Sequence, residues 1–293
     1  HVRASSMLLV AAFFWDSGNV SQKLVLDEIG PLTAVGLRCL IGAVVILPFV
    51  LRELRPGIQA GRLAIRGMLV VATLFAGAIT LQQVSYAATT VTNASFLINM
   101  TTVVTPLVVW ALLKTRPTTA IWAAVAAAFA GALLMSGGSL STIASGDLGC
   151  LLAAVLYSVW FVKLGKVVCD SGRPVLVTMV QFLLTGGTCL AIGFASETVS
   201  VDRLTAALPN LLVLGVFATG LAYGLQAIAQ QYATASTAAV LTSAESVFGA
   251  GAAALLLGER FTPLMLLGAA LILIAILTVQ LAPTATPRLA VGG

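Results

Sequence analysis

Long runs of apolar residues, separated by short breaks rich in polar residues, glycine and proline, make up nearly the whole chain. The runs are continuous rather than alternating, and most reach the roughly 20 residues that a helix needs to cross the hydrocarbon core of a bilayer. The pattern predicts ten membrane-spanning helices, at residues 6–25, 32–51, 66–86, 92–113, 118–137, 148–167, 174–195, 208–228, 236–257 and 263–282.

The composition predicts the same class of protein, an all-α integral membrane protein. Hydrophobic residues form 59% of the 293-residue chain and charged residues only 9%. A soluble domain carries about 25% charged residues, so the surface of a soluble protein of this size could not be covered, and soluble enzymes are excluded. We expect the lipid bilayer and a small solute as partners and no nucleic acid, because the net charge of +5 belongs to the loops. The oligomeric state stays open, a monomer included.

The distribution of basic residues favours an even number of spans with both termini in the cytoplasm. Ten spans then place Lys23, Arg203 and Arg260 outside and Arg38 within a span, while every other basic residue falls inside. Such an excess of Lys and Arg is typical of cytoplasmic loops. Adding or removing one helix would mix the two sides.

The two halves of the chain resemble one another at a nearly constant offset. A shift of 144 residues aligns Gln82 with Gln226, and a shift of 142 places Trp15 opposite Tyr157. Further pairs at the shift of 144 are Thr90 and Thr234, Ala94 and Ala238, and Leu97 and Leu241. We therefore predict two five-helix repeats, at residues 6–137 and 148–282, divided at the polar break Ser136-Gly137-Gly138-Ser139.

The odd number of helices in each repeat has a topological consequence. The second repeat must enter the membrane in the opposite orientation to the first. Inverted repeats of this kind are typical of transporters, in which a pocket between the halves opens to either side in turn. The sequence therefore predicts a carrier that works by alternating access.

Several segments resemble the EamA-type unit of the drug/metabolite transporter superfamily. They are Trp15 to Asn19, Gly30-Pro31-Leu32-Thr33 leading to Arg38, Thr92 to Phe96 followed by Thr105-Pro106-Leu107, and Leu257 to Thr262 followed by Leu267-Gly268-Ala269. The sequence departs from the pattern at Asp16, where the family commonly has glycine. It departs again at Lys114-Thr115-Arg116, which replaces the Gly-Glu-Arg turn kept at 258–260.

The resemblance implies a ten-helix carrier of the bacterial inner membrane. Within the superfamily the chain is most similar to bacterial exporters of aromatic amino acids. The resemblance thus implies a secondary transporter that exports small metabolites, most of all aromatic or large neutral amino acids. A carrier of a different metabolite or of a drug is the alternative.

Three ionisable residues lie inside predicted spans. Charged groups at membrane depth are costly and usually face a cavity or one another. Arg38 is a candidate for binding a substrate carboxylate, or it ties helices together and extends to the interface. Glu245 is a candidate for binding an amine or carrying a proton, or it anchors two helices by hydrogen bonds. Asp16, beside Trp15, is a third candidate for the binding site. The alternative is that Asp16 is an engineered or idiosyncratic substitution without a role in binding.

Amides and aromatic residues complete the predicted binding site. Amides offer both hydrogen-bond donors and acceptors to a zwitterion, although they also join membrane helices. Aromatic rings can stack on a ring-bearing solute, although near the membrane surface they serve as anchors. The candidates are Asn19, Gln82, Asn99, Gln226, Trp15, Tyr86, Tyr157, Trp160 and Tyr223.

Other function classes fit the sequence less well. An intramembrane enzyme needs a catalytic set, but the one histidine is His1 and no GxSxG or HExxH motif occurs. A channel or sensor is a further alternative without a supporting motif. We expect no metal and no cofactor. The sequence contains no Walker-type phosphate-binding loop, so a gradient of solute or ions would drive transport.

Overall fold

The computed structural model of the protein describes residues 2–54, 62–135, 145–248 and 262–281, and these residues form helices and no strand. The prediction of an all-α fold is therefore confirmed. The helices are α1 (Val2–Glu28), α2 (Pro31–Glu53), α3 (Arg62–Ala87), α4 (Val91–Asn99), α5 (Thr101–Leu113), α6 (Thr119–Met135), α7 (Ser145–Ser171), α8 (Pro174–Ser196), α9 (Val201–Leu212), the π-helical stretch η1 (Val213–Leu221), α10 (Ala222–Ala229), α11 (Ala235–Thr242) and α13 (Pro263–Leu281). A further helical turn begins at Glu245.

Within the described residues, seven helical segments are long and apolar enough to cross a membrane. They are Pro31–Glu53, Ile65–Ala87, Asn93–Leu113, Ser145–Ser171, Pro174–Ser196, Val201–Ala229 and Pro263–Leu281. α1, with 27 residues, and α6, with 17, fall outside this set. The predicted break at 136–139, the motif at 257–261 and the end of the ninth span lie outside the described residues. The count of ten spans and the domain bounds thus stay predictions.

Two predicted spans differ from the helices of the structure in where they begin or in whether they are continuous. The eighth begins at Val201 rather than 208, because Ser200 caps the helix by accepting a bond from the Arg203 N–H, and Asp202 suits a helix N-terminus. It then passes through η1, where the hydrogen bonding is π-helical. The fourth span is interrupted at Met100, well before Pro106.

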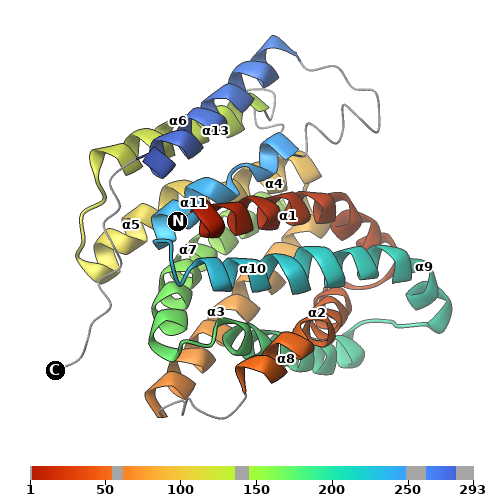
Figure 1. Ribbon diagram of the computed structural model, residues 1–293. Helices are drawn as coiled ribbons and strands as arrows, with labels where there is room; N and C mark the ends of the chain where they lie inside the picture. Colours follow the sequence, from red (N-terminus) through yellow and green to blue (C-terminus); the bar gives the residue numbers. More distant parts are fainter. Residues whose placement is uncertain (1, 55–61, 136–144, 249–261, 282–293) are drawn as a thin grey trace.

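Helices from the two halves of the chain pack against one another in pairs: α2 with α8, α3 with α7, and α6 with α13. Figure 1 shows α6 and α13 side by side at the top of the view. This pair requires glycine at its crossing. A Cβ on Gly131 would lie 2.6 Å from the Gly268 carbonyl oxygen, and a Cβ on Gly268 would lie 2.7 Å from that of Gly131.

The α2–α8 pair is fastened at both ends by reciprocal carboxylate caps. Glu197, after the end of α8, accepts bonds from the Leu32 N–H (2.8 Å) and Thr33 N–H (2.9 Å) at the start of α2. At the other end Glu53, the last residue of α2, accepts bonds from the first turn of α8, namely Val175 N–H (3.1 Å) and Leu176 N–H (2.8 Å). Each carboxylate satisfies amide groups that a helix N-terminus leaves without partners. The two helices are thus antiparallel and held together at opposite ends.

Local geometry recurs 144 residues apart along the chain. Thr90 caps α4 by accepting a bond from the Asn93 N–H, and Thr234 caps α11 in the same way from the Thr237 N–H. Each helix ends in a tightened turn at equivalent positions: Met100 N–H bonds the Leu97 carbonyl, and Ala244 N–H bonds the Leu241 carbonyl. The same sequence signals therefore produce the same caps and breaks in both halves.

We predict that the reciprocal caps stabilise the protein independently. Glu53→Ala and Glu197→Ala should each lower the free energy of unfolding by about 1–2 kcal/mol, and the double variant by the sum, because the sites are far apart. The measurement is thermal unfolding in detergent. Asp27→Ala, at an exposed acid of α1, is the matched control. Unfolding of the glutamate variants at the temperature of this control would contradict the assignment.

Candidate functional site

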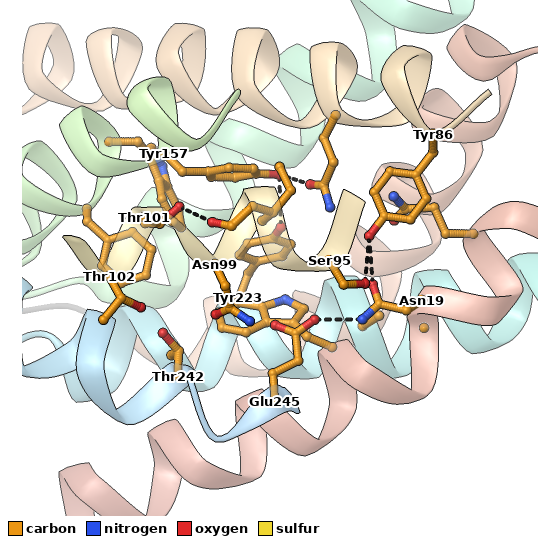
Figure 2. Close-up of a pocket in the computed structure, with 18 of the residues that line it drawn as sticks. Asn19, Tyr86, Ser95, Asn99, Thr101, Thr102, Tyr157, Tyr223, Thr242 and Glu245 are labelled. Carbon is orange, nitrogen blue, oxygen red and sulfur yellow. Dashed lines mark hydrogen bonds between the residues drawn. The ribbon is translucent and has the colours of Figure 1, made fainter. Parts of the chain in front are cut away.

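A pocket of about 700 Å³, including the part open to solvent, lies among α1, α2, α3, the α4–α5 turn, α7, η1, α10 and the turn after α11. Most of the predicted site residues come together in its wall. These are Trp15, Asn19, Arg38, Gln82, Tyr86, Asn99, Tyr157, Trp160, Tyr223 and Glu245. Figure 2 shows Tyr157, Tyr223, Asn19 and Glu245 around the hollow.

Two predicted site residues do not line the pocket. Asp16 is half-buried on α1, next to Trp15 and three residues before Asn19, so it lies beside the site and not in its wall. Gln226, on α10, is fully buried, and neither its amide nitrogen nor its oxygen has a hydrogen-bond partner in the part of the chain that the structure describes.

Gln22, an amide of the same kind as Asn19, also lines the pocket. The lining residues that the sequence prediction missed are Gly18, Ser95, Ile98, Thr101, Thr102, Phe161, Ala218 and Thr242. Thr101 carried a signal, because it is the repeat equivalent of Glu245. The small and apolar ones carried none, because such residues are common along every helix of this chain.

Arg38 is buried in α2, with 3% of its surface exposed, and its guanidinium is held by neutral groups. Nε donates to the Thr219 hydroxyl (2.9 Å), and Nη1 donates to the side-chain oxygen of Gln22 (2.9 Å) and, more weakly, of Gln83 (3.4 Å). No described carboxylate lies within ion-pair distance. Arg38 therefore joins α1, α3 and η1 to α2. None of its partners carries a negative charge, so its positive charge is not neutralised in the pocket that it lines.

Glu245 carries the opposite charge to Arg38, and it too is held by a neutral group, the amide of Asn19. The Asn19 amide nitrogen donates to Glu245 Oε1 at 2.7 Å. The oxygen of the same amide accepts from the Tyr86 hydroxyl at 3.2 Å (Figure 2). No basic residue among those described lies within ion-pair distance of Glu245. The pocket thus contains one cation and one carboxylate that neutral partners position but do not neutralise.

The partners of these two charges lie on one face of α1. Asn19, which binds Glu245, and Gln22, which binds Arg38, are three residues apart. Side chains at this spacing are neighbours on a helix, with Cβ atoms about 5–6 Å apart. The partners of the positive and the negative group thus lie next to one another on α1, and both groups line the same pocket.

Aromatic rings centred on Tyr223 form another part of the wall. The Tyr223 ring lies 5.1 Å from Trp15, 4.9 Å from Phe75 and 5.7 Å from Trp160, each edge to face. Its hydroxyl is 3.3 Å from that of Tyr157, which donates to the Gln82 oxygen at 2.7 Å. Trp15 and Tyr157, predicted to be symmetry mates, thus enter the same pocket from α1 and α7.

Comparison with known proteins identifies the family. The model of the EamA-like transporter family matches residues 2–137 and again residues 144–281. The chain belongs to this family, within the drug/metabolite transporter superfamily, and is a multi-pass membrane transporter rather than an enzyme.

Two relatives of similar length are described as transporters. An uncharacterized transporter of Archaeoglobus fulgidus is 29% identical over 94% of this chain and 84% of its own length. The uncharacterized transporter YwfM of Bacillus subtilis is 27% identical over 95% of this chain and 94% of its own. A crystal structure of a protein 17% identical to this chain has the same fold, with a TM-score of 0.78 over 96% of this chain and 97% of the other.

We predict that Tyr223 stabilises the pocket wall through its ring rather than its hydroxyl. Tyr223→Ala should cost about 3–5 kcal/mol of unfolding free energy, as for other buried aromatic residues. Tyr223→Phe, which loses only the contact with Tyr157, should cost about 1 kcal/mol. Chemical unfolding in detergent measures both. Tyr232→Ala, at an exposed tyrosine after α10, is the matched control. An equal loss in the Phe and Ala variants would assign the stability to the hydroxyl instead.

Proposed function

We propose that this protein is a secondary transporter that exports amino acids, particularly aromatic or large neutral ones, by alternating access. The observation that carries the proposal is the pairing of Arg38 and Glu245 in one pocket. Each accepts a hydrogen bond from, or donates one to, a neutral amide of α1, and these two amides, Asn19 and Gln22, are three residues apart on one face of the helix. An α-amino acid carries a carboxylate and an ammonium group a few ångströms apart and is neutral overall, so it complements this pair.

The rest of the wall favours an apolar substrate side chain. Trp15, Tyr157, Trp160 and Tyr223 line the pocket together. Aromatic rings pack edge to face or offset on another ring and add about 0.5–1.5 kcal/mol beyond the burial of area. A large neutral or aromatic side chain would gain most from this wall, whereas a charged one would lose its hydration.

Two halves of common origin support alternating access. The family model matches the chain twice, caps and helix breaks recur 144 residues apart, and the helices of one half pack on those of the other. The reciprocal caps of Glu53 and Glu197 are related in the same manner. These features support ten spans arranged as two inverted five-helix repeats. The bias of basic residues supports cytoplasmic termini, and the resemblance to bacterial exporters supports the bacterial inner membrane. The direction of transport rests on the resemblance to bacterial exporters.

The proposed substrate class is tested by counterflow in proteoliposomes. We expect labelled L-phenylalanine to exchange with internal L-phenylalanine and L-tryptophan. Two analogues each lack one charge: 2-phenylethylamine lacks the carboxylate and 3-phenylpropionate lacks the amine. Each should compete at least about 10-fold more weakly, because a charge-assisted hydrogen bond contributes about 1.5–3 kcal/mol. Exchange of drugs or other metabolites without any amino acid would refute the substrate class and leave a carrier.

Variants assign the two charges of the substrate to their partners. Arg38→Gln should abolish the preference for L-phenylalanine over 2-phenylethylamine but retain that over 3-phenylpropionate. Glu245→Gln should have the opposite effect on the two preferences, because it removes the partner of the amine. Competition against labelled L-phenylalanine measures both. Arg66→Gln, at an exposed residue of α3, is the control and should change neither preference. Loss of both preferences together in each variant would show that the two charged residues hold the helices in place and do not bind the charged groups of the substrate.

A further inference from the structure

One hydrogen bond in the pocket joins residues that the repeat relates to another pair. The Tyr157 hydroxyl, on α7, donates to the Gln82 side-chain oxygen, on α3, at 2.7 Å. The shift of 144 residues relates Gln82 to Gln226, and the shift of 142 relates Trp15 to Tyr157. The counterpart of this bond would therefore join Trp15 on α1 to Gln226 on α10.

The counterpart bond is not formed in this structure, and both of its members are without partners. The Trp15 indole nitrogen is buried and makes no hydrogen bond, and the same holds for both polar atoms of the Gln226 amide. Gln226 is completely buried. A buried polar group without a partner costs about 1–3 kcal/mol, so three such atoms at one symmetry-related position call for a state in which they are satisfied.

The two groups lie on helices that pack against one another. α1 packs along α10, and the Trp15 ring contacts the Tyr223 ring at 5.1 Å. Tyr223 and Gln226 are three residues apart and hence on the same face of α10. A relative movement of α1 and α10 is therefore the motion that would bring the indole N–H to the Gln226 oxygen.

We propose that the Tyr157–Gln82 and Trp15–Gln226 pairs are positioning contacts that form in alternate states of the transport cycle. In a transporter of two inverted repeats, each repeat adopts in one state the arrangement that the other adopts in the opposite state. The bond formed by one half here is then exchanged for the bond of the other half. This inference rests on the alternating access of the proposed function and not on the class of substrate.

The experiment follows water access at two symmetry-related positions. Ser95 lines the pocket, whereas its equivalent at the shift of 144, Ala239, is buried with 1% exposed. A single cysteine is introduced as Ser95→Cys or Ala239→Cys in the full-length protein. Its reaction rate with a small charged methanethiosulfonate reagent is measured in detergent, against the parent protein with its four native cysteines.

Opposite responses are expected from the two amides. Gln82→Leu removes the bond of the present state, so the Ser95→Cys rate should fall and the Ala239→Cys rate should rise, the ratio changing about 2- to 10-fold. Gln226→Leu removes the bond of the other state and should shift the ratio in the opposite sense. Tyr157→Phe removes the hydroxyl that donates to Gln82, and Trp15→Phe removes the indole N–H together with part of the ring. They should reproduce the two shifts, which keeps the test informative if an amide variant fails to fold.

The outcomes separate this inference from the proposed function. Shifts of the same sign in both sets, or no shift while both positions are labelled, would overturn the alternating pairs and leave alternating access standing. An Ala239→Cys position that never reacts, in the parent or in any variant, would remove the exchange of states itself and with it the inference. Amino-acid exchange in proteoliposomes does not enter the readout, so an error in the substrate class leaves the result unchanged.

Discussion

The cost of placing charge in hydrocarbon is the constraint on which the rest of this structure depends. A buried guanidinium is tolerated when hydrogen-bond acceptors surround it or a hollow relieves its desolvation. Arg38 has both, with acceptors from α1, α3 and η1 and a face on the pocket. Glu245 repeats the arrangement with the opposite charge through Asn19. Because these acceptors come from different helices, the same bonds that make the charges tolerable also fix the helices around the hollow.

Specialised pairs of helices surround this polar centre. α2 and α8 are clamped at both ends by the caps of Glu53 and Glu197, and α6 and α13 approach closely enough to require glycine at their crossing. Two of the spans that line the pocket are interrupted: the fourth predicted span breaks at Met100, and the eighth passes through a π-helical stretch. Interrupted hydrogen bonding in a membrane helix is tolerated where it faces protein or a cavity.

The aromatic wall and the polar centre meet at Tyr157. Its ring belongs to the cluster around Tyr223 and Trp160, and its hydroxyl joins that cluster to Gln82. Repeat symmetry is imperfect at this point, because Trp15 offers a single donor where Tyr157 offers a donor and an acceptor. The difference between these two residues is therefore a difference between the two halves of the pocket.

The sequence by itself determined the all-α membrane class, most helix bounds and the residues that define the family, because apolar runs of membrane length and breaks at proline and glycine are local signals. It also selected most of the pocket wall, since charged, amide and aromatic side chains are rare in such runs and their presence at membrane depth needs a reason. Only the tertiary structure decided the hydrogen-bond partners of the two charged residues, which are Gln22 and Thr219 for Arg38 and Asn19 for Glu245. It also decided that Gln226 does not line the pocket. These facts depend on the rotation and depth of each helix against its neighbours. Because these helices are apolar on every face, their sequences do not specify which face turns toward the neighbouring helices, and only packing decides it.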